Sequence, residues 1–253
     1  MAIGGSLDGE RRRAEIVALA REPGGVLIDA AAQRFAVSTM TIRRDLVELE
    51  AEGLLRRVRG GAMGSPPPRL FGERARMNAA AKRVIARKAA EILPSRGTIA
   101  LDASTTISTV AGSLASPGGL TAATNSPETF ARLARLDGLS PVLTGGEAEP
   151  TTGSLVGPIA HQGARALFYD VFLLSAGAVE PDAGTTEVSL AEADVKRAFA
   201  ANARDVVLCV DSSKLGERSP ARALELSEIT MLVTELDPAD ARLDAYRDAV
   251  EVL

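Results

Sequence analysis

The sequence predicts an α/β protein built from an N-terminal winged helix-turn-helix domain and a C-terminal parallel sheet covered by helices. Three helical patterns, followed by an Arg- and Gly-rich strand pattern, occupy the first 62 residues. Glycine, serine and three consecutive prolines then interrupt the chain at 64–68, where proline cannot continue a helix or a central strand. Beyond them, short apolar runs alternate with helical patterns, the order typical of a parallel sheet.

Length, charge and cysteine content limit the class of protein. A chain of 253 residues suits a small domain joined to a medium one, and we expect domains at 1–62 and 77–253 with a linker at 63–76. The net charge of −4 argues against nucleic-acid binding by bulk charge, so any such contact must come from a local patch. A single cysteine, Cys209, excludes an internal disulfide framework and a multi-cysteine zinc site.

Three helices are expected in the N-terminal domain. Apolar residues at helical spacing predict the first over 10–22, ended by Pro23-Gly24-Gly25. We expect Asp29 to cap the second and Ser38 to cap the third. The third helix then presents hydroxyls and arginines near its start, an arrangement that lets side chains reach base edges in a major groove.

A strand with a glycine turn is expected over 54–61, after Gly53 ends the third helix. This wing contains Arg56, Arg57 and Arg59, and no acidic residue lies between 53 and 62. Arginines placed there contact phosphates, which gives affinity and salt dependence without reading sequence.

The segment 12–62 resembles the DeoR family of bacterial transcription regulators. The resemblance lies in Val37-Ser38, Thr41-Ile42-Arg43-Arg44-Asp45-Leu46, Leu49, Gly53, Arg57 and Gly60-Gly61-Ala62. It implies DNA contacts from Ser38, Thr39, Thr41, Arg43 and Arg44, beside Met40, which the spacing turns outward. We expect Asp45 to orient its flanking arginines by ion pairing. The alternative is that this polar helix is only a solvated face.

The C-terminal domain begins with an expected helix over 79–93, whose exposed side is assigned to Lys82, Arg83, Arg87 and Lys88. The strands that follow are predicted at 98–102, 120–125, 142–144, 170–176, 205–210 and 231–234. Helices are predicted at 105–114, 127–136, 158–166 and 190–202.

Polar residues gather where the predicted strands end. The first group is Asp102-Ala103-Ser104-Thr105-Thr106, hydroxyls at a helix start that suit a phosphate. The others are Thr124-Asn125-Ser126, Thr144-Gly145-Gly146, Ser175-Ala176-Gly177 and Asp211-Ser212-Ser213-Lys214, joined by Gly184-Thr185-Thr186-Glu187 and Lys196. Each group alone is typical of an ordinary cap or turn. Together they are expected to line one crevice, because ligands bind beyond the carboxyl ends of parallel strands.

The resemblance to the DeoR family extends through these groups to its sensor domain, which is similar in fold to sugar-phosphate isomerases. It implies a phosphorylated sugar or related metabolite as effector, with the phosphate on Ser104, Thr105, Thr106 and Lys214. Hydroxyls are assigned to Asp102, Asn125, Glu187 and Lys196, the two lysines being interchangeable; Thr124, Gly145, Gly177 and Asp211 complete the set. Ser104 and Ala81 depart from the Gly and Glu common in the family.

A sugar-phosphate isomerase is the alternative function. Such enzymes need a carboxylate base near the substrate carbon and a group that stabilises an enediolate. The nominal candidates are Asp102, Glu187, Asp211 and Lys214. The Asp-Gly-Ala-Asp motif of the isomerases corresponds here to Ser175-Ala176-Gly177-Ala178, which carries no acid. The sole histidine, His161, has no carboxylate nearby in sequence and is interpreted as structural. We expect no enzyme, metal or cofactor.

We therefore expect a DNA-binding regulator, a repressor of sugar-metabolism genes released by its effector, although a co-repressor mode fits the residues equally well. A homodimer or homotetramer is expected, because paired recognition helices read repeated half-sites. No signal peptide or membrane-spanning run is evident, which predicts a cytoplasmic protein with no membrane partner. A purely structural DNA-compacting protein is disfavoured by the acidic C-terminal domain.

Overall fold

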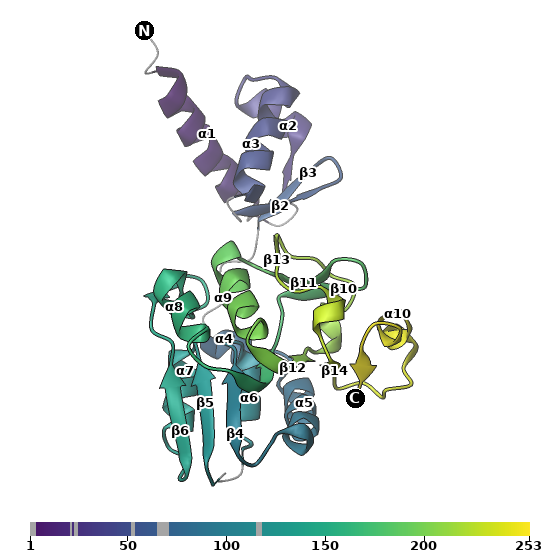
Figure 1. Cartoon of the computed structure of the whole chain (residues 1–253). Coiled ribbons are helices and arrows are strands. Elements are labelled where there is room, and N and C mark those ends of the chain that lie inside the picture. The colour runs from purple at the N-terminus through teal and green to yellow at the C-terminus, as the bar shows by residue number, and fades with distance from the viewer. Residues whose placement is uncertain (1–3, 21, 23–24, 52–53, 65–70, 115–117) are drawn as a thin grey trace. The chain divides into compact units, whose positions relative to one another are not determined.

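A computed structural model describes residues 4–20, 22, 25–51, 54–64, 71–114 and 118–253 (Figure 1). Contacts divide the chain into two compact units, 1–68 and 69–253. The expected Gly53 cap and the proline-rich segment 65–68 lie outside the described residues. Within the described part, no helix is both long and apolar enough to cross a membrane.

The N-terminal unit contains the three expected helices, α1 (Gly4–Ala20), α2 (Ile28–Arg34) and α3 (Thr39–Ala51). Ile16 from α1 packs with Ile42, Leu46 and Leu49 from α3 in a common core, which confirms the predicted inward face. The prediction that Asp29 caps α2 is wrong. Helix α2 begins at Ile28 with Leu27 at its N-cap, two residues before the predicted cap. Asp29 lies in the first turn, where the helix dipole stabilises a carboxylate.

The predicted wing is present and gains a third strand. Strands β1 (Val26–Leu27), β2 (Leu55–Val58) and β3 (Gly61–Gly64) form an antiparallel sheet in the order β1-β3-β2. The turn between β2 and β3 uses Gly60 at φ +87°. A Cβ on Gly61 would lie 2.2 Å from the carbonyl oxygen of Val26, so only glycine allows the two backbones to approach this closely.

The C-terminal unit is built on a seven-stranded, all-parallel sheet, as predicted. Its order is β15-β14-β12-β9-β4-β5-β6. The strands are β4 (Gly97–Leu101), β5 (Leu120–Thr124), β6 (Leu139–Leu143), β9 (Tyr169–Leu174), β12 (Ala203–Cys209), β14 (Met231–Val233) and β15 (Glu251–Val252).

Two separate cores cover the faces of this sheet. Along β9, Phe172 and Leu174 enter a core shared with Phe199, whereas Val171 and Leu173 enter one shared with Ile85. This alternation confirms that both faces are buried, since successive side chains of a strand point to opposite sides. The α-helices of the unit are α4 (Phe71–Arg76), α5 (Ala79–Ile92), α6 (Thr105–Ala111), α7 (Pro127–Leu133), α8 (Gly157–Ala164), α9 (Leu190–Ala200) and α10 (Asp244–Arg247).

Smaller elements lie beside the main sheet, and the sequence patterns did not predict them. Strands β10 (Ala178–Glu180), β11 (Gly184–Glu187) and β13 (Ala221–Arg222) form an antiparallel sheet, and β7 (Glu147–Ala148) pairs with β8 (Leu155–Val156) in a hairpin. Short 3₁₀ helices occur at Ser212–Lys214, Leu226–Glu228 and Ala241–Leu243. The antiparallel sheet brings Glu187 next to the ends of the parallel strands.

Candidate nucleic-acid interface and effector site

Helix α3 starts as the sequence predicts. The hydroxyl of Ser38 accepts a hydrogen bond from the backbone N–H of Thr41 at 3.1 Å, and the two hydroxyls lie 2.9 Å apart. Ser38, Thr39 and Met40 are exposed at this end, and Thr41 is half-buried. The start of the helix therefore presents hydroxyls and a methionine to solvent.

Asp45 does not pair with the arginines that flank it, contrary to the prediction. Its side chain is buried and accepts hydrogen bonds from Nε and Nη2 of Arg12 in α1, at 2.7 and 3.2 Å. Arg13 Nη1 lies 3.8 Å from the same carboxylate. Because Asp45 projects from the inward face of α3, its contacts fasten α3 to α1 rather than orienting Arg43 and Arg44.

The two arginines after Ile42 differ in their contacts. Arg44 donates from Nε to Glu48 at 3.2 Å, and the same glutamate accepts from Arg13 at 3.0 Å. Arg43 is exposed and has no ion pair or hydrogen bond from its side chain to any described residue. Both extend from the outer part of α3, but only Arg43 is unrestrained.

In the wing, Arg57 is held by Glu50 of α3. Its backbone N–H donates to Glu50 at 2.8 Å and its Nε at 2.5 Å. Partial burial opposes the charge of Glu50, but these bonds and the arginine charge lower its pKa below the ordinary value. Arg59 is exposed at the turn, and the side chain of Arg56 lies outside the described residues.

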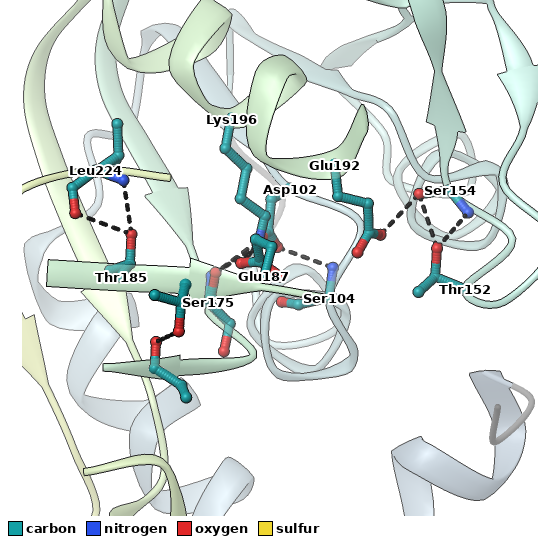
Figure 2. A network of polar contacts seen from close by, with 12 residues as sticks. Asp102, Ser104, Thr152, Ser154, Ser175, Thr185, Glu187, Glu192, Lys196 and Leu224 are labelled. Atoms are coloured by element: carbon teal, nitrogen blue, oxygen red, sulfur yellow. Dashed lines mark hydrogen bonds and ion pairs between the residues drawn. The ribbon is translucent and has the colours of Figure 1, made fainter. Parts of the chain in front are cut away.

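In the C-terminal unit, the buried Lys196 joins two other predicted effector residues, Asp102 and Glu187 (Figure 2). Lys196 of α9 places Nζ 2.9 Å from Asp102 and 2.5 Å from Glu187, and donates to the carbonyl oxygen of Ser175 at 2.6 Å. Asp102 also accepts from the backbone N–H groups of Ser104 and Ser175, each at 2.9 Å. Both oxygens of Asp102 are therefore engaged, whereas Glu187 accepts only from Lys196 among the described residues.

Crowding of acids around one lysine shifts two pKa values. Burial opposes the charge of Lys196, but Asp102, Glu187 and Glu192 together raise its pKa above the usual value. For Glu187, burial raises the pKa to about 7, aided by the charges of Glu192 and Asp102 and opposed by Lys196. Burial therefore favours the protonated form of Glu187 more than it does for an exposed glutamate.

A chain of hydrogen bonds runs from α9 to the β7–β8 hairpin, also visible in Figure 2. Ser154 donates to Glu192 at 2.8 Å, and its hydroxyl lies 2.9 Å from that of Thr152. The carbonyl oxygen of Thr152 accepts from Arg74 of α4 at 2.9 Å, and Arg74 Nε is buried with no partner among the described residues. The hairpin therefore connects α9 to α4.

Lys82 is buried, which overturns its assignment to the exposed side of α5. Its Nζ donates to Thr105 Oγ1 at 2.9 Å and to the carbonyl oxygen of Arg74 at 2.6 Å. Burial lowers its pKa, countered by Asp211 and reinforced by the positive charges of Lys214 and Arg74. Three cations thus gather near the turn between β4 and α6. Spacing contained the signal, since Lys82 is three residues before Ile85 on the apolar face of α5.

Asp211, before the Ser212–Lys214 helix, also belongs to this region. It accepts from Asn78 Nδ2 at 2.9 Å and from the hydroxyl of Ser213. Asn78 has a left-handed backbone with φ +50°, a conformation that asparagine tolerates better than most residues. The sequence did not assign Asn78, Arg74 or Lys82 to the site. The structure joins Lys82 to the predicted phosphate residue Thr105 and to Arg74, and it joins Asn78 to Asp211.

Comparison with known proteins assigns both units. Residues 12–64 match the DeoR-like helix-turn-helix domain, and residues 77–236 match the DeoR C terminal sensor domain. The chain is 34% identical over 252 residues to the HTH-type transcriptional regulator GlpR of Haloferax volcanii, covering 98% of each chain. It belongs to the DeoR family. It is also 30% identical to the glycerol-3-phosphate regulon repressor of Escherichia coli, covering 94% of this chain and 95% of that one.

Two solved structures are similar to parts of this DeoR-family chain. Ribose 5 phosphate isomerase A from Neisseria gonorrhoeae matches with 24% identity and a TM-score of 0.39, over 54% of this chain and 53% of that one. eIF2B beta from Chaetomium thermophilum matches with 14% identity and a TM-score of 0.44, over 68% and 54%.

The remaining predicted effector residues of this DeoR-family regulator lie in the surrounding loops. Ser104 caps α6, its hydroxyl accepting from Ile107 at 3.1 Å, and Thr106 is buried behind it. Asn125 donates to the carbonyl oxygen of Leu155 at 3.1 Å, leaving its own side-chain oxygen buried without a partner among the described residues. No hydrogen bond joins the members of the following set to Lys196 among the described residues: Thr124, Asn125, Gly145 and Gly177.

His161 has a carboxylate partner that sequence proximity did not reveal. Its Nδ1 lies 2.9 Å from Asp194, which approaches from α9. The pair joins α8 to α9 and remains partly exposed to solvent. Among the described residues, no group of three or more His, Cys, Asp or Glu is arranged to hold a metal ion.

Proposed function

We propose that this DeoR-family regulator represses genes of sugar metabolism and that a phosphorylated sugar controls its affinity for operator DNA. The observation that carries the effector assignment is the buried ammonium of Lys82 on the hydroxyl of Thr105, beside the charges of Lys214 and Arg74. Crowded cations with a buried, unpartnered Arg74 Nε favour a dianionic ligand. A phosphate monoester has that charge and supplies several acceptor oxygens.

The two ends of the proposed effector bind different groups of residues. The phosphate is assigned to Ser104, Thr105, Thr106 and Lys214, with Lys82 added. The hydroxyl-bearing end faces Glu187 and Asn125, each of which keeps an acceptor oxygen unused among the described residues. Asp102 already has both oxygens engaged, so we assign it to holding Lys196 in position. Thr124, Gly145, Gly177 and Asp211 shape the surrounding loops.

Helix α4 offers a route from the effector to the DNA-binding unit. It is the first described element after residues 65–70, and Lys82 holds its last turn through the carbonyl oxygen of Arg74. A phosphate that draws Lys82 toward itself competes with that bond. Control of DNA binding requires the effector to bind the DNA-competent and DNA-incompetent states unequally, and α4 is where we expect those states to differ.

The DNA side of the proposal uses Ser38, Thr39, Met40, Thr41, Arg43 and Arg44 in the major groove and the wing arginines Arg56, Arg57 and Arg59 on phosphates. A homodimer or homotetramer accounts for reading repeated half-sites. Binding of chromosomal DNA places such a regulator in the cytoplasm.

We infer that the protein is not an isomerase. Asp102 accepts two backbone hydrogen bonds and pairs with Lys196, so it is not poised to remove a proton from carbon. Ser175 contributes only its backbone to this cluster among the described contacts. Relatives named as transcriptional regulators support the same conclusion.

Two measurements test the proposal. Sugar phosphates are screened for thermal stabilisation of the full chain, and we expect a subset to raise Tm in a manner abolished by Lys214→Met. The active esters are then added to complexes with promoter DNA, where a change in affinity is expected. Equal stabilisation by the unphosphorylated sugars rejects the phosphate site, and stabilisation without any change in DNA affinity rejects the control mechanism.

A further inference from the structure

The acidic residues of α3 divide the arginines around them into restrained and unrestrained groups. Asp45 holds Arg12, and Glu48 holds both Arg13 and Arg44. These contacts link α1 to one side of α3. Arg43, one position before Arg44, has no side-chain partner among the described residues. The arginine pair is therefore asymmetric before any DNA is bound.

The restraint on Arg44 affects which part of DNA it suits. Its Nε is committed to Glu48, so that edge of the guanidinium is not free for DNA, and the carboxylate beside it is repelled by the acceptor atoms O6 and N7 of guanine. Bidentate recognition of guanine O6 and N7 requires a guanidinium whose fork is free to align in the base plane. A single contact to a phosphate needs no such alignment. The unrestrained Arg43 is therefore suited to guanine, and the restrained Arg44 is suited to a phosphate.

An exposed methionine lies one turn before Arg43 on the same helix. Met40 is 70% exposed, so its side chain is accessible to a binding partner. Residues three apart on a helix have Cβ atoms about 5–6 Å apart, and successive bases of a strand rise about 3.4 Å. The side chains of Met40 and Arg43 therefore have the spacing to contact adjacent bases. In a major groove the apolar feature available to Met40 is the thymine methyl group.

We propose that Arg43 reads a guanine and Met40 contacts the methyl group of a neighbouring thymine, whereas Arg44, restrained by Glu48, contacts the DNA backbone. This inference rests on the DNA-binding function and specifies how its sequence preference arises. It predicts that each half-site contains a G next to a T, in contact with α3. Arg44 supplies affinity that is independent of sequence.

In vitro selection from a randomised duplex pool tests the division of roles, using the full-length wild type, Arg43→Ala and Arg44→Ala. The wild type should select a motif with an essential G. Arg43→Ala should lose the preference at that position alone, with affinity for the wild-type site lowered about tenfold or more. Arg44→Ala should select the same motif, bind all sites more weakly, and show a salt dependence reduced by about one counterion.

Deoxyuridine in place of thymine tests the methionine, because it removes only the methyl group. The substitution next to the G should weaken wild-type binding several-fold and leave Met40→Ala unaffected. The roles are overturned if Arg44→Ala changes the motif, if Arg43→Ala keeps it, or if deoxyuridine has no effect on the wild type. Failure of the wild type to select any motif rejects sequence-specific DNA binding itself, and this inference with it. Thermal unfolding confirms that each variant remains folded.

Discussion

Asp45 of α3 lies 2.7 Å from Nε of Arg12 in α1, and this pair fastens the candidate recognition helix to the first helix. The carboxylate side chain is 5% exposed and the arginine 17% exposed, so little solvent screens the interaction. A buried pair adds modest stability when intact, but removing one partner leaves a charge without compensation. The integrity of the helix-turn-helix unit therefore depends on Asp45 more than on any exposed ion pair around it.

Asp45→Asn should destabilise the N-terminal unit by about 2–4 kcal/mol, because Arg12 and Arg13 both lose their shared anion. Chemical denaturation of the full chain, followed by circular dichroism, measures the effect as an earlier loss of helical signal. Glu48→Gln is the matched control: that carboxylate is 39% exposed, and its loss should cost less than about 1 kcal/mol. Equal losses in the two variants would contradict the special role of Asp45.

Lys82→Met should separate ligand binding from stability. We expect the variant to bind the stabilising sugar phosphate at least about tenfold more weakly, since a charge-assisted contact to the phosphate is lost. Its unfolding free energy should stay within about 1–2 kcal/mol of the wild type, because the loss of two hydrogen bonds is offset by removing a buried ammonium. Isothermal titration calorimetry measures the first quantity and urea unfolding the second.

The neighbouring Arg83 is exposed on the same helix and provides the control. Arg83→Met removes the same charge and should leave affinity for the sugar phosphate unchanged. If both variants lose affinity equally, general electrostatic attraction explains the binding. If Lys82→Met unfolds the domain while the ligand still binds the residual folded fraction normally, Lys82 is a structural residue.

Sequence reasoning located the elements whose patterns are local. Period and turn chemistry identified α3, its Ser38 cap and the wing, and alternation of strands and helices identified the parallel sheet. The antiparallel sheet was missed because strands of two to four residues, such as β11, are too short to display a period. The sequence therefore identified site residues on these short strands, such as Glu187, but not the residues that surround them in the fold.

The second limit on prediction was identifying which side chain each polar residue contacts in the folded chain. Asp45 directly follows two arginines in the sequence, yet its partner Arg12 is 33 residues away, because α1 packs against the face of α3 that carries Asp45. Lys82 was assigned to solvent by residue type although its spacing placed it on the apolar face of α5. In both cases the prediction followed the polarity of the side chain. The position of the residue on its helix, and the element packed against that face, instead determine its contacts.

Glu187→Gln should change the pH dependence of stability. Because burial raises the pKa of Glu187 to about 7, the folded state binds more protons than the unfolded chain between about pH 4.5 and 7. The contribution of Glu187 to the unfolding free energy of the wild type therefore decreases as pH rises from about 4.5 to 7, and it is lost above pH 7. The unfolding free energy of Glu187→Gln relative to wild type should rise between pH 5 and pH 8, on the order of 1–3 kcal/mol. Parallel stability profiles over this range would contradict the assignment.

Gly184→Ala should disrupt the small antiparallel sheet that carries Glu187. Gly184 has φ +69°, and a Cβ there would lie 2.1 Å from the carbonyl oxygen of Leu224, so both backbone conformation and contact oppose a side chain. We expect a loss of about 3 kcal/mol or more in unfolding free energy, together with weaker binding of the sugar phosphate.

Gly216→Ala is the matched control, since its φ of +72° imposes the same backbone cost but nothing lies within 4 Å of the added Cβ. It should cost only about 1 kcal/mol. If the two substitutions destabilise equally, backbone conformation alone determines the cost and the close approach of β11 to Leu224 contributes nothing.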